Sequence, residues 1–560
     1  MFFQIQKNIK KNSAAGWILL AIFVVGVFLR TYNFHAWLEF RSDQARDAYR
    51  TDQVVSGEKP WPLVGPFLSH SGPTEDESFH VGPIYYYFQI ISAEIFGSYP
   101  DKLAYPDVFF AILSIPLFYL FLREYFGKNV SLGLTGLYSI GAYIIRYSRF
   151  AWSCNSIPFF VLLFLLSLFK LWDKNEKTAW AWAVALGVAW GVGFQLHALT
   201  MIAFSGTAFL VFIFSMRKNP ATWKKWSVVL AIFVLLNSAQ VVGEIKTNFE
   251  NTRALSRFLF QNGSADNPSG LDSSNPINHA GVSTLLKNDI DCSLEANFLY
   301  LSSYNDVAFG RENCQGNYWK LFSRSNTKKH SKVSWIKIGD VVLFSSLVFS
   351  LVGYFLLLFY DKKEPNERKR RFLHLLVLYT GLAFLLMLPL SSGKFGDLRY
   401  FSLLFFLPFL FLGLIAKLLF EKVAPKYIAI PVAAVIFSLF AASNVSAITY
   451  RLSILSKKEG MDSGTAVLGE MEDTLDYAIS HSNGQKKIYL GGNRSLTAHS
   501  FDSLQYLAGK QNVGLIKFGD KDKLDPAKKP AFCVDDKIDK KEAVYGYKKV
   551  GNVYIYQINK

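Results

Sequence analysis

The sequence predicts a polytopic α-helical membrane protein that ends in a small α/β domain. About half of the 560 residues are hydrophobic (51%) and only 18% are charged, which is too apolar for a soluble multidomain protein. Apolar runs recur along the chain, and each is about 20 residues long, enough to cross about 30 Å of hydrocarbon as a helix. The last part of the chain has short runs rich in β-branched and aromatic residues instead, which is typical of strands.

The formal net charge of +17 does not indicate a nucleic-acid partner. The positive residues lie mainly in short loops between the apolar runs and near the C-terminus, and they form no basic stripe with interleaved aromatic residues. In membrane proteins, Lys and Arg in short loops mark the cytoplasmic side. The loop charges therefore assign the orientation of each span.

The first span is expected at residues 14–29. Three lysines precede it and no small-residue cleavage site is evident, so we interpret it as an uncleaved helix with a cytoplasmic N-terminus. Residues 31–80 hold eight acids and four bases, which fits the non-cytoplasmic side. The apolar run 82–97 is short and contains Gln89 and Glu94. We interpret it as an interfacial helix, because every later loop then obeys the positive-inside rule.

Ten further spans bring the expected number of transmembrane helices to about eleven. They lie at 103–122, 129–146, 156–172, 178–196, 198–216, 226–243, 336–360, 372–390, 401–419 and 427–448. The loop 361–371 has six Lys or Arg against three acids, the strongest cytoplasmic signal in the chain. Residues 1–450 are thus expected to form a transmembrane domain with two outer loops, 31–102 and 244–335. The protein is expected in the plasma (inner) membrane, with its C-terminal domain extracytoplasmic.

Residues 451–560 are expected to form this soluble α/β domain. Strands are predicted at 486–490, 513–518, 531–534, 544–549 and 552–558, with a helical pattern near 501–509. The sequence Gly491-Gly492-Asn493 lacks the glycine spacing and the lysine of a nucleotide-binding loop.

The long outer loop contains two of the four cysteines. Residues 261–280 are rich in Asn, Ser, Gly, Asp and Pro, which predicts an irregular lid. Cys292 and Cys314 could form a disulfide if this loop lies outside the cytoplasm. Cys154 and Cys533 are expected to be free thiols, and no pair of cysteines has metal-ligand spacing.

Residues 40–50 hold the densest charged motif next to a span. As a helix, this segment puts Asp43 and Asp47 on one face, one turn apart, and Arg46 and Arg50 form a second such pair. A carboxylate can take a proton from an attacking hydroxyl, and an arginine can hold a phosphate through two parallel hydrogen bonds. The alternative is a solvated interfacial helix with ordinary ion pairs.

The predicted topology brings further polar side chains to the same membrane surface, where ionisable residues at helix ends are functional candidates. They are His70 and His80, Arg146 and Arg149 with Asn155, His197, Glu244, and Lys394 with Arg399. Such a surface suits a lipid phosphate at headgroup depth, bound by Lys394 and Arg399, below a carboxylate that faces a hydroxyl acceptor. Phosphate is a good leaving group, so one base and cationic stabilisation would suffice. By analogy with glycosidases, direct attack would invert the anomeric centre.

Over about residues 14–450, the chain resembles the GT-C superfamily of polyprenyl-phosphate-sugar glycosyltransferases, in particular the branch with protein O-mannosyltransferases and bacterial aminoarabinose transferases. The segment Asp43-Gln44-Ala45-Arg46-Asp47 matches the position of the family's acidic motif. The resemblance implies that Asp43 is the catalytic base, that Arg46 and Asp47 support it, and that Lys394, Arg399 and Tyr400 bind the donor phosphate. His80, Arg149, Asn155 and His197 fall on segments that contact substrate in that family.

The chain departs from the family pattern at two positions. Gln44 replaces the usual second acid, and Asn155 stands where some relatives have an aspartate that can bind a metal. No metal-ligating residue is therefore assigned, and two alternatives stay open for the cofactor: none, or a divalent metal. The expected partners are a polyprenyl-phosphate sugar, membrane lipid and an acceptor glycan, lipid or protein.

A transporter or flippase of a lipid-linked glycan is the alternative function. It would need charged or broken helices near the bilayer midplane. In this sequence the polar residues gather at helix ends, which favours the enzyme. The sequence does not name the sugar or the acceptor.

Overall fold

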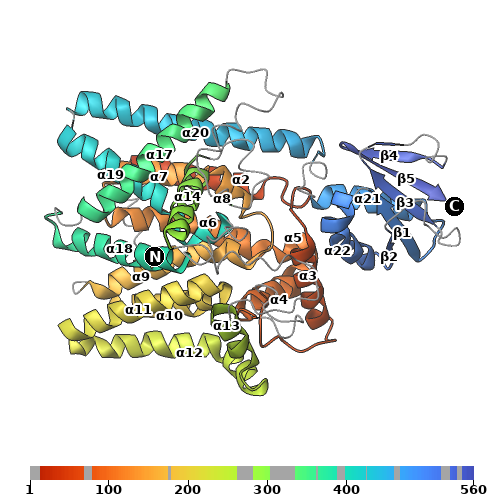
Figure 1. Cartoon of the computed structure of the whole chain (residues 1–560), viewed down its shortest axis with the longest axis horizontal. Coiled ribbons are helices and arrows are strands. Elements are labelled where there is room, and N and C mark those ends of the chain that lie inside the picture. The colour runs from red at the N-terminus through yellow and green to blue at the C-terminus, as the bar shows by residue number, and fades with distance from the viewer. Residues whose placement is uncertain are drawn as a thin grey trace.

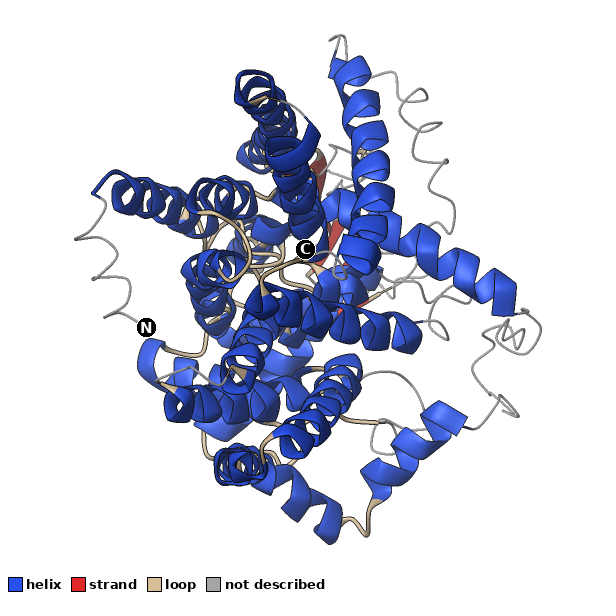
Figure 2. Ribbon diagram, turned by 90° about the vertical axis from the view of Figure 1, so that its left-hand side faces the viewer, coloured by secondary structure: helices blue, strands red, loops and turns tan. Residues whose placement is uncertain are grey.

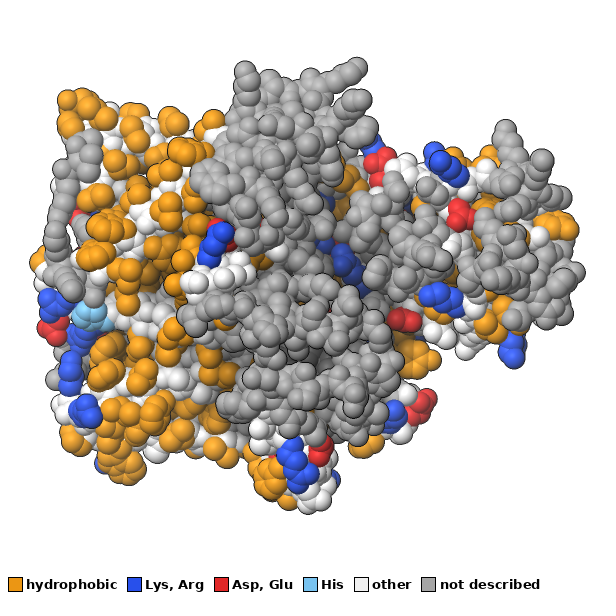
Figure 3. All heavy atoms as spheres, in the orientation of Figure 1, with side chains coloured by type: hydrophobic (Ala, Val, Ile, Leu, Met, Phe, Trp, Pro, Cys, Tyr) orange, Lys and Arg blue, Asp and Glu red, His pale blue; other side chains and the backbone are white. Residues whose placement is uncertain are grey.

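The computed structural model contains a bundle of membrane-length helices and a small sheet domain at one end of it (Figure 1). It describes residues 13–67, 79–173, 178–260, 282–302, 314, 335–360, 364–387, 398–423, 425–459, 467–492, 494–518, 530–535, 537–538 and 545–559. Figure 2 looks along the bundle from the end opposite to the sheet domain. Hydrophobic side chains cover the visible flank of the bundle, while charged ones gather at its far end and on the sheet domain (Figure 3).

Ten helical segments of the described residues are long and apolar enough to cross a membrane, which confirms a multi-pass membrane protein. They comprise α2 (Ser13–Thr31), α6 (Tyr105–Arg123), α9 (Ile157–Trp172), α10 (Ala179–Leu196), α11 (Ala198–Lys218), α12 (Trp223–Lys246), α17 (Trp335–Tyr360), α18 (Glu367–Met387), α19 (Leu407–Leu418) and α20 (Lys426–Ser456). The short helix η6 (Leu398–Leu404) precedes α19, and η7 (Leu419–Val423) follows it. Leu, Phe and Tyr side chains from these helices form one large buried core.

One of the eleven predicted spans, 129–146, is not a single helix. It is broken into α7 (Lys128–Ser139) and α8 (Ala142–Arg146), with Gly141 in extended conformation between them. Side chains of other helices satisfy the backbone groups that the break leaves open. Arg30 of α2 donates to the Ser139 carbonyl at 2.8 Å, and the N–H of Ala142 donates to the side chain of Asn444 at 2.9 Å.

Short helices cover the end of the bundle that faces the sheet domain. They are α3 (Ser42–Val55), α4 (Ile84–Phe96), α5 (Pro100–Leu103), η1 (Ser153–Ser156) and α13 (Glu250–Phe260). With 13 residues, α4 is about 20 Å long, too short to cross the bilayer. It packs against α3, α5 and α10.

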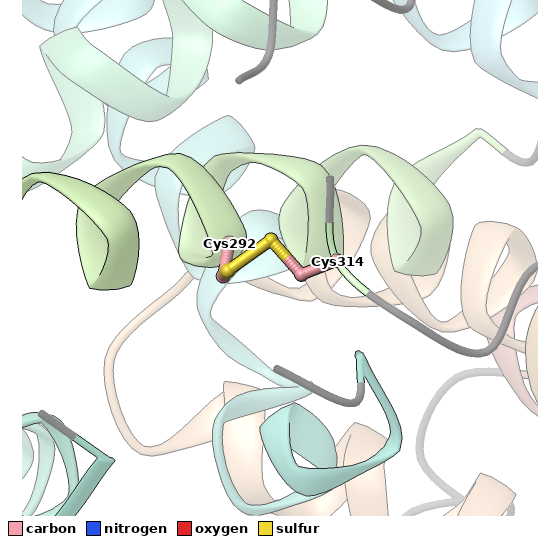
Figure 4. The surroundings of a disulfide bond; sticks show 2 residues. All are labelled: Cys292 and Cys314. Carbon is pink, nitrogen blue, oxygen red and sulfur yellow. A yellow bond between two sulfur atoms is a disulfide. The ribbon is translucent and has the colours of Figure 1, made fainter. Parts of the chain in front are cut away.

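The long loop 244–335 contains more helix than the sequence indicated. In addition to α13, it forms α14 (Val282–Leu301), which packs across α17, α19 and η6. The predicted lid at 261–280 lies outside the described residues. Cys292 of α14 is bonded to Cys314, so the disulfide that the sequence left open is formed (Figure 4). Cys154 and Cys533 are buried and are not part of a disulfide in the described structure.

The C-terminal domain has one five-stranded sheet in the order β2-β1-β3-β5-β4. Its elements are α21 (Leu468–Ser480), β1 (Lys487–Gly492), α22 (Arg494–Lys510), β2 (Gly514–Lys517), β3 (Ala531–Asp535), β4 (Tyr547–Val550) and β5 (Val553–Asn559). β2, β1 and β3 are parallel, and β5 and β4 form the antiparallel hairpin that the sequence predicts. The sequence missed α21, and α20 continues six residues past the expected domain boundary at 450.

We expect Asn444→Ala to destabilise the bundle more than any exposed polar substitution on α20. The buried amide of Asn444 joins α20 to the Ala142 N–H and to the Leu301 carbonyl, so its removal leaves both without this partner. An unsatisfied buried polar group costs about 1–3 kcal/mol. Thermal unfolding in detergent should show a lower Tm for this variant. Thr449→Ala, at an exposed position on the same helix, is the matched control, and equal Tm values for the two variants would contradict the role assigned to Asn444.

Candidate functional site

The charged motif at residues 40–50 forms the first part of α3, as predicted. Arg41 precedes the helix, and its backbone N–H donates to the side-chain oxygen of Gln44 at 3.0 Å. A side-chain amide or carboxylate at this position stabilises a helix N-terminus by accepting such a bond. Gln44 is buried, so this capping role accounts for a residue that departs from the acidic family pattern.

The two acids of α3 have different surroundings. The Asp43 side chain is 61% exposed, and one oxygen lies 3.5 Å from Nη1 of Arg46. The Asp47 side chain is only 4% exposed, and its Oδ1 accepts hydrogen bonds from Arg46 at 2.9–3.0 Å and from the Tyr86 hydroxyl at 3.0 Å. The carboxylate of Asp47 is thus hydrogen-bonded to neighbouring side chains, whereas Asp43 presents its carboxylate to solvent.

The burial of Asp47 and of Tyr86 also shifts their pKa values. Burial raises the pKa of the Asp47 carboxyl, although the charge and hydrogen bonds of Arg46 oppose that shift. Burial and the nearby Asp47 raise the pKa of Tyr86, so its hydroxyl stays a hydrogen-bond donor. Arg46 lies between the two carboxylates and stacks 4.6 Å above the ring of Phe67.

A cavity of about 160 Å³ opens beside Asp43. It is lined by Asp43, Arg46 and Asp47 of α3, by Pro66, Phe67 and Val81, by Trp152, Ser153 and Cys154, by Leu196 and His197 at the junction of α10 and α11, and by Tyr400 of η6. Residues that are up to about 350 positions apart in the sequence therefore surround one space. Of the elements that line the cavity, α3 lies at the end of the bundle next to the C-terminal domain (Figure 1).

His197 is the cavity residue that begins a membrane helix. Its Nδ1 accepts the backbone N–H of Leu199 at 3.2 Å, which caps the N-terminus of α11. The neutral ring must then carry its hydrogen on Nε2, and this nitrogen is a donor. The ring also lies 5.2 Å from that of Tyr400.

Three other expected site residues, His80, Arg149 and Asn155, are not among the described residues that line this cavity. His80 hydrogen-bonds to the Gly65 carbonyl at 2.8 Å and, through its backbone, to Asn251 at 2.7 Å. Arg149 donates to backbone carbonyls of Leu29, Tyr32 and Asn33. Asn155 donates to the Phe150 carbonyl and lines a smaller neighbouring cavity. His70 and Lys394, as well as the side chain of Arg399, lie outside the described residues.

Sequence reasoning missed three residues that shape the site. Tyr86 holds Asp47, and Phe67 covers Arg46. Asp107 of α6 accepts hydrogen bonds from the Tyr85 hydroxyl at 2.8 Å, from Ser156 at 3.1 Å and from the N–H of Trp152 at 3.4 Å, so it fixes the wall of the cavity at Trp152. As the single acid in its apolar run, Asp107 could have been identified as an intramembrane ionisable residue.

The donor set of the cavity does not fit a tightly bound divalent metal. The guanidinium of Arg46 lies where a cation shared by Asp43 and Asp47 would sit, and it would repel that cation. Among the described residues, no three His, Cys, Asp or Glu side chains form a cluster that could hold a metal ion.

Known proteins provide an independent comparison. The family described as dolichyl-phosphate-mannose-protein mannosyltransferase matches residues 80–241 of this chain. The matched part runs from His80 into α12 and includes the cavity residues Val81, Trp152–Cys154, Leu196 and His197. Over these residues the match confirms the resemblance inferred from the sequence. No curated protein matches the chain.

Two solved structures are similar to this chain at low sequence identity. ArnT from Cupriavidus metallidurans bound to undecaprenyl phosphate is 13% identical over 98% of each chain, with a TM-score of 0.45. The Archaeoglobus fulgidus oligosaccharyltransferase tethered to an acceptor peptide is 13% identical over 91% of this chain and 64% of its own, also with a TM-score of 0.45.

The approach to α3 is fixed by a buried carboxylate. Glu39 pairs with Arg146 of α8 at 2.9 Å, with Arg451 of α20 at 2.5 Å and with Arg41 at 3.4 Å. Burial alone would raise the pKa of Glu39, but these three guanidiniums outweigh it and hold that pKa well below its usual range.

We expect Glu39→Gln to destabilise the protein by about 3–5 kcal/mol at neutral pH, because it leaves buried arginines without their carboxylate. An acid whose pKa is lowered by folding stabilises the protein above its unfolded pKa, about 4.3 for Glu, and loses this effect as the pH falls through the folded pKa. The Tm difference between wild type and variant should therefore stay constant from pH 8 to 5 and narrow below about pH 4. A difference that grows in acid would contradict this account. Glu94→Gln, at an exposed position on α4, should have no such effect.

Proposed function

We propose that this protein is a membrane glycosyltransferase that moves a sugar from a polyprenyl-phosphate donor to a hydroxyl acceptor. One observation carries the proposal: a single cavity at the end of the bundle joins the exposed carboxylate of Asp43, the guanidinium of Arg46 and His197 at the N-terminus of a membrane helix. The match of residues 80–241 to a family of dolichyl-phosphate-mannose-dependent transferases supports the class of donor.

The donor phosphate is proposed to lie at the His197 and Tyr400 side of the cavity. The N-terminus of a helix carries a partial positive charge and attracts phosphate groups. The α11 helix begins at Ala198, and His197 adds an N–H donor at the same place. Lys394 and Arg399 remain proposed phosphate ligands because they belong to the segment that leads into Tyr400. The lipid tail would then extend between membrane helices.

Asp43 is the proposed general base. Its carboxylate accepts the proton of the acceptor hydroxyl while that oxygen bonds to the anomeric carbon of the sugar. The bond between the anomeric carbon and the phosphate oxygen breaks, and the electron pair leaves with polyprenyl phosphate, whose charge the helix terminus and His197 stabilise. The proton then passes from Asp43 to water. A single direct displacement of this kind inverts the anomeric centre.

Asp47 is less suited to the role of base. Its Oδ1 is held by Arg46 and Tyr86, and its side chain is buried. We propose that Asp47 fixes the guanidinium of Arg46, which in turn orients Asp43. Asp43 would thus act as the base, and Asp47 would hold the arginine that orients it.

The cavity and the C-terminal domain are proposed to lie on the extracytoplasmic side of the plasma membrane. Arg217 and Lys218 end α11, which starts at the cavity, so they lie at the other end of the bundle. Lys224 and Arg370 follow short loops of the same kind. Figure 3 shows Lys and Arg side chains at the end of the bundle away from the sheet domain. The disulfide between Cys292 and Cys314 fits an oxidising compartment.

Asp43→Asn should reduce sugar transfer by about 10²–10⁴-fold, the usual effect of losing a general base. Purified protein would be given a panel of radiolabelled polyprenyl-phosphate sugars and membrane extract, and label leaving the lipid fraction would be counted. Folding and polyprenyl-phosphate binding should be retained, because Asp43 is exposed and makes only a weak ion pair.

Glu58→Gln is the matched control, since Glu58 is an exposed acid just after α3. Undiminished transfer by the Asp43→Asn protein would overturn the base assignment. Absence of transfer from every donor by the wild type, with lipid binding retained, would instead favour transport of a lipid-linked glycan.

His197→Asn should weaken binding of the donor phosphate about 10-fold or more, the scale of one hydrogen bond to a charged group. Asparagine is a good N-cap, so it preserves the start of α11, but it is too short to offer the donor at Nε2. Affinity for polyprenyl phosphate would be measured in detergent. His374→Asn, at an exposed position on α18, is the control; equal affinities for both variants would argue against a phosphate site at His197.

A further inference from the structure

The α3 helix has two functional faces. Asp43, Arg46 and Asp47 line the cavity on one of them. Asp52 follows Asp43 by nine residues, which at about 100° per residue puts the two carboxylates on opposite sides of the helix. Ala45 and Ala48 lie on the Asp52 side and are buried. The face turned away from the cavity is therefore also covered by protein.

The covering element is α22 of the C-terminal domain. It packs directly against α3, and the two helices lie side by side in Figure 1. Ala45 and Ala48 belong to the same buried apolar cluster as Leu504 and Leu507 of α22. Two small side chains on α3 let the backbones approach closely, so a shift of α22 would be transmitted to α3.

Polar contacts fix the position of α22 along α3. Nζ of Lys510 lies 2.7 Å from Oδ2 of Asp52, near the end of α3, and 3.0 Å from the hydroxyl of Ser98. Tyr506 donates to the Ser98 carbonyl at 3.1 Å. Its ring packs 5.6 Å from that of Phe40, which precedes α3. One helix of the C-terminal domain thus contacts both ends of α3 and the turn between α4 and α5.

A second helix of the domain holds the chain just before α3. The N–H groups of Leu468 and Gly469 at the start of α21 donate to the carbonyls of Leu38 and Ala36 at 2.8 and 3.1 Å. Glu472 of α21 accepts a hydrogen bond from Tyr99 at 2.5 Å and lies 3.2 Å from His35. The C-terminal domain is joined to the segments around the cavity by one continuous core and by these polar contacts.

We infer that the C-terminal domain acts as a positioning element of the transferase site: it holds α3 from the face opposite the cavity so that Asp43 stays aimed into it. Lys510 is a positioning residue in this arrangement, since it touches neither the cavity nor the proposed substrate. The inference rests on the proposed function only for its effect on transfer. The fixation of α3 itself does not depend on which reaction occurs.

Lys510→Glu tests the inference in the full-length protein. It places two carboxylates against each other and should push α22 away from α3, while global folding survives because the original pair is partly exposed and contributes about 0–1 kcal/mol. A displacement of about 1 Å at a reacting group can cost about 10²-fold in rate. We expect kcat to fall about 10-fold to 100-fold, with the donor KM changed less than about twofold. Amide hydrogen exchange of α3 should become faster.

Asp52→Lys should have the same effect, and the double variant with both changes should regain most of the lost kcat, because it restores an ion pair of opposite polarity. Lys548→Glu is the matched control. Lys548 pairs with Asp473 inside the same domain at similar exposure, 38% and 26% against 28% and 25% for Lys510 and Asp52, but it does not touch α3. This control should leave kcat and the exchange of α3 unchanged.

The outcomes separate the two proposals. Unchanged exchange of α3 and unchanged kcat in Lys510→Glu would overturn the positioning role, even if the wild type transfers sugar. A rise in the acceptor KM alone would also overturn it and would assign the domain to acceptor binding. If the wild type transfers no sugar, the proposed function fails, while the exchange rates of α3 still decide whether the domain fixes this helix.

Discussion

The ion pairs of Glu39 hold together the part of the molecule on which the candidate site depends. A buried carboxylate is costly unless it is paired and hydrogen-bonded, and Glu39 meets that condition with arginines from α8, from α20 and from the turn before α3. The three elements come from distant parts of the sequence. Their shared carboxylate sets where the chain leaves the first membrane helix and hence where α3 starts.

The acids of α3 illustrate how surroundings divide roles between similar side chains. Asp43 and Asp47 are one turn apart, yet one is mostly exposed and the other is enclosed by Arg46, Tyr86 and the body of the helix. The enclosed acid orients the arginine, and the arginine lies against the exposed acid. Gln44 between them serves the helix terminus. The short segment thus combines an exposed carboxylate, an enclosed carboxylate and its own helix cap.

Much of this architecture could be predicted from the sequence, because it depends on local pattern. Apolar length located the membrane helices, and alternation located the strands of the C-terminal sheet. The sequence did not predict the break between α7 and α8, because the side chains that satisfy its backbone groups, Arg30 and Asn444, come from other helices. For the candidate site, position and residue type were enough to propose Asp43, Arg46 and His197, and the structure brings these three residues to one cavity. The hydrogen-bond partners of Asp47, Arg149 and Asp107 are set by long-range packing. Contacts of this kind cannot be read from a single sequence.

The shared core of α3 and α22 has a consequence for how the protein is made. About 450 residues separate the two helices in the chain, and the buried face of α3 includes Ala45 and Ala48. During synthesis that face has no cover until the ribosome has finished α22, long after the first membrane helices have been inserted. Assembly of the cavity is therefore one of the last steps of biogenesis. A truncated chain that has all its membrane helices would still lack the contacts between α22 and α3.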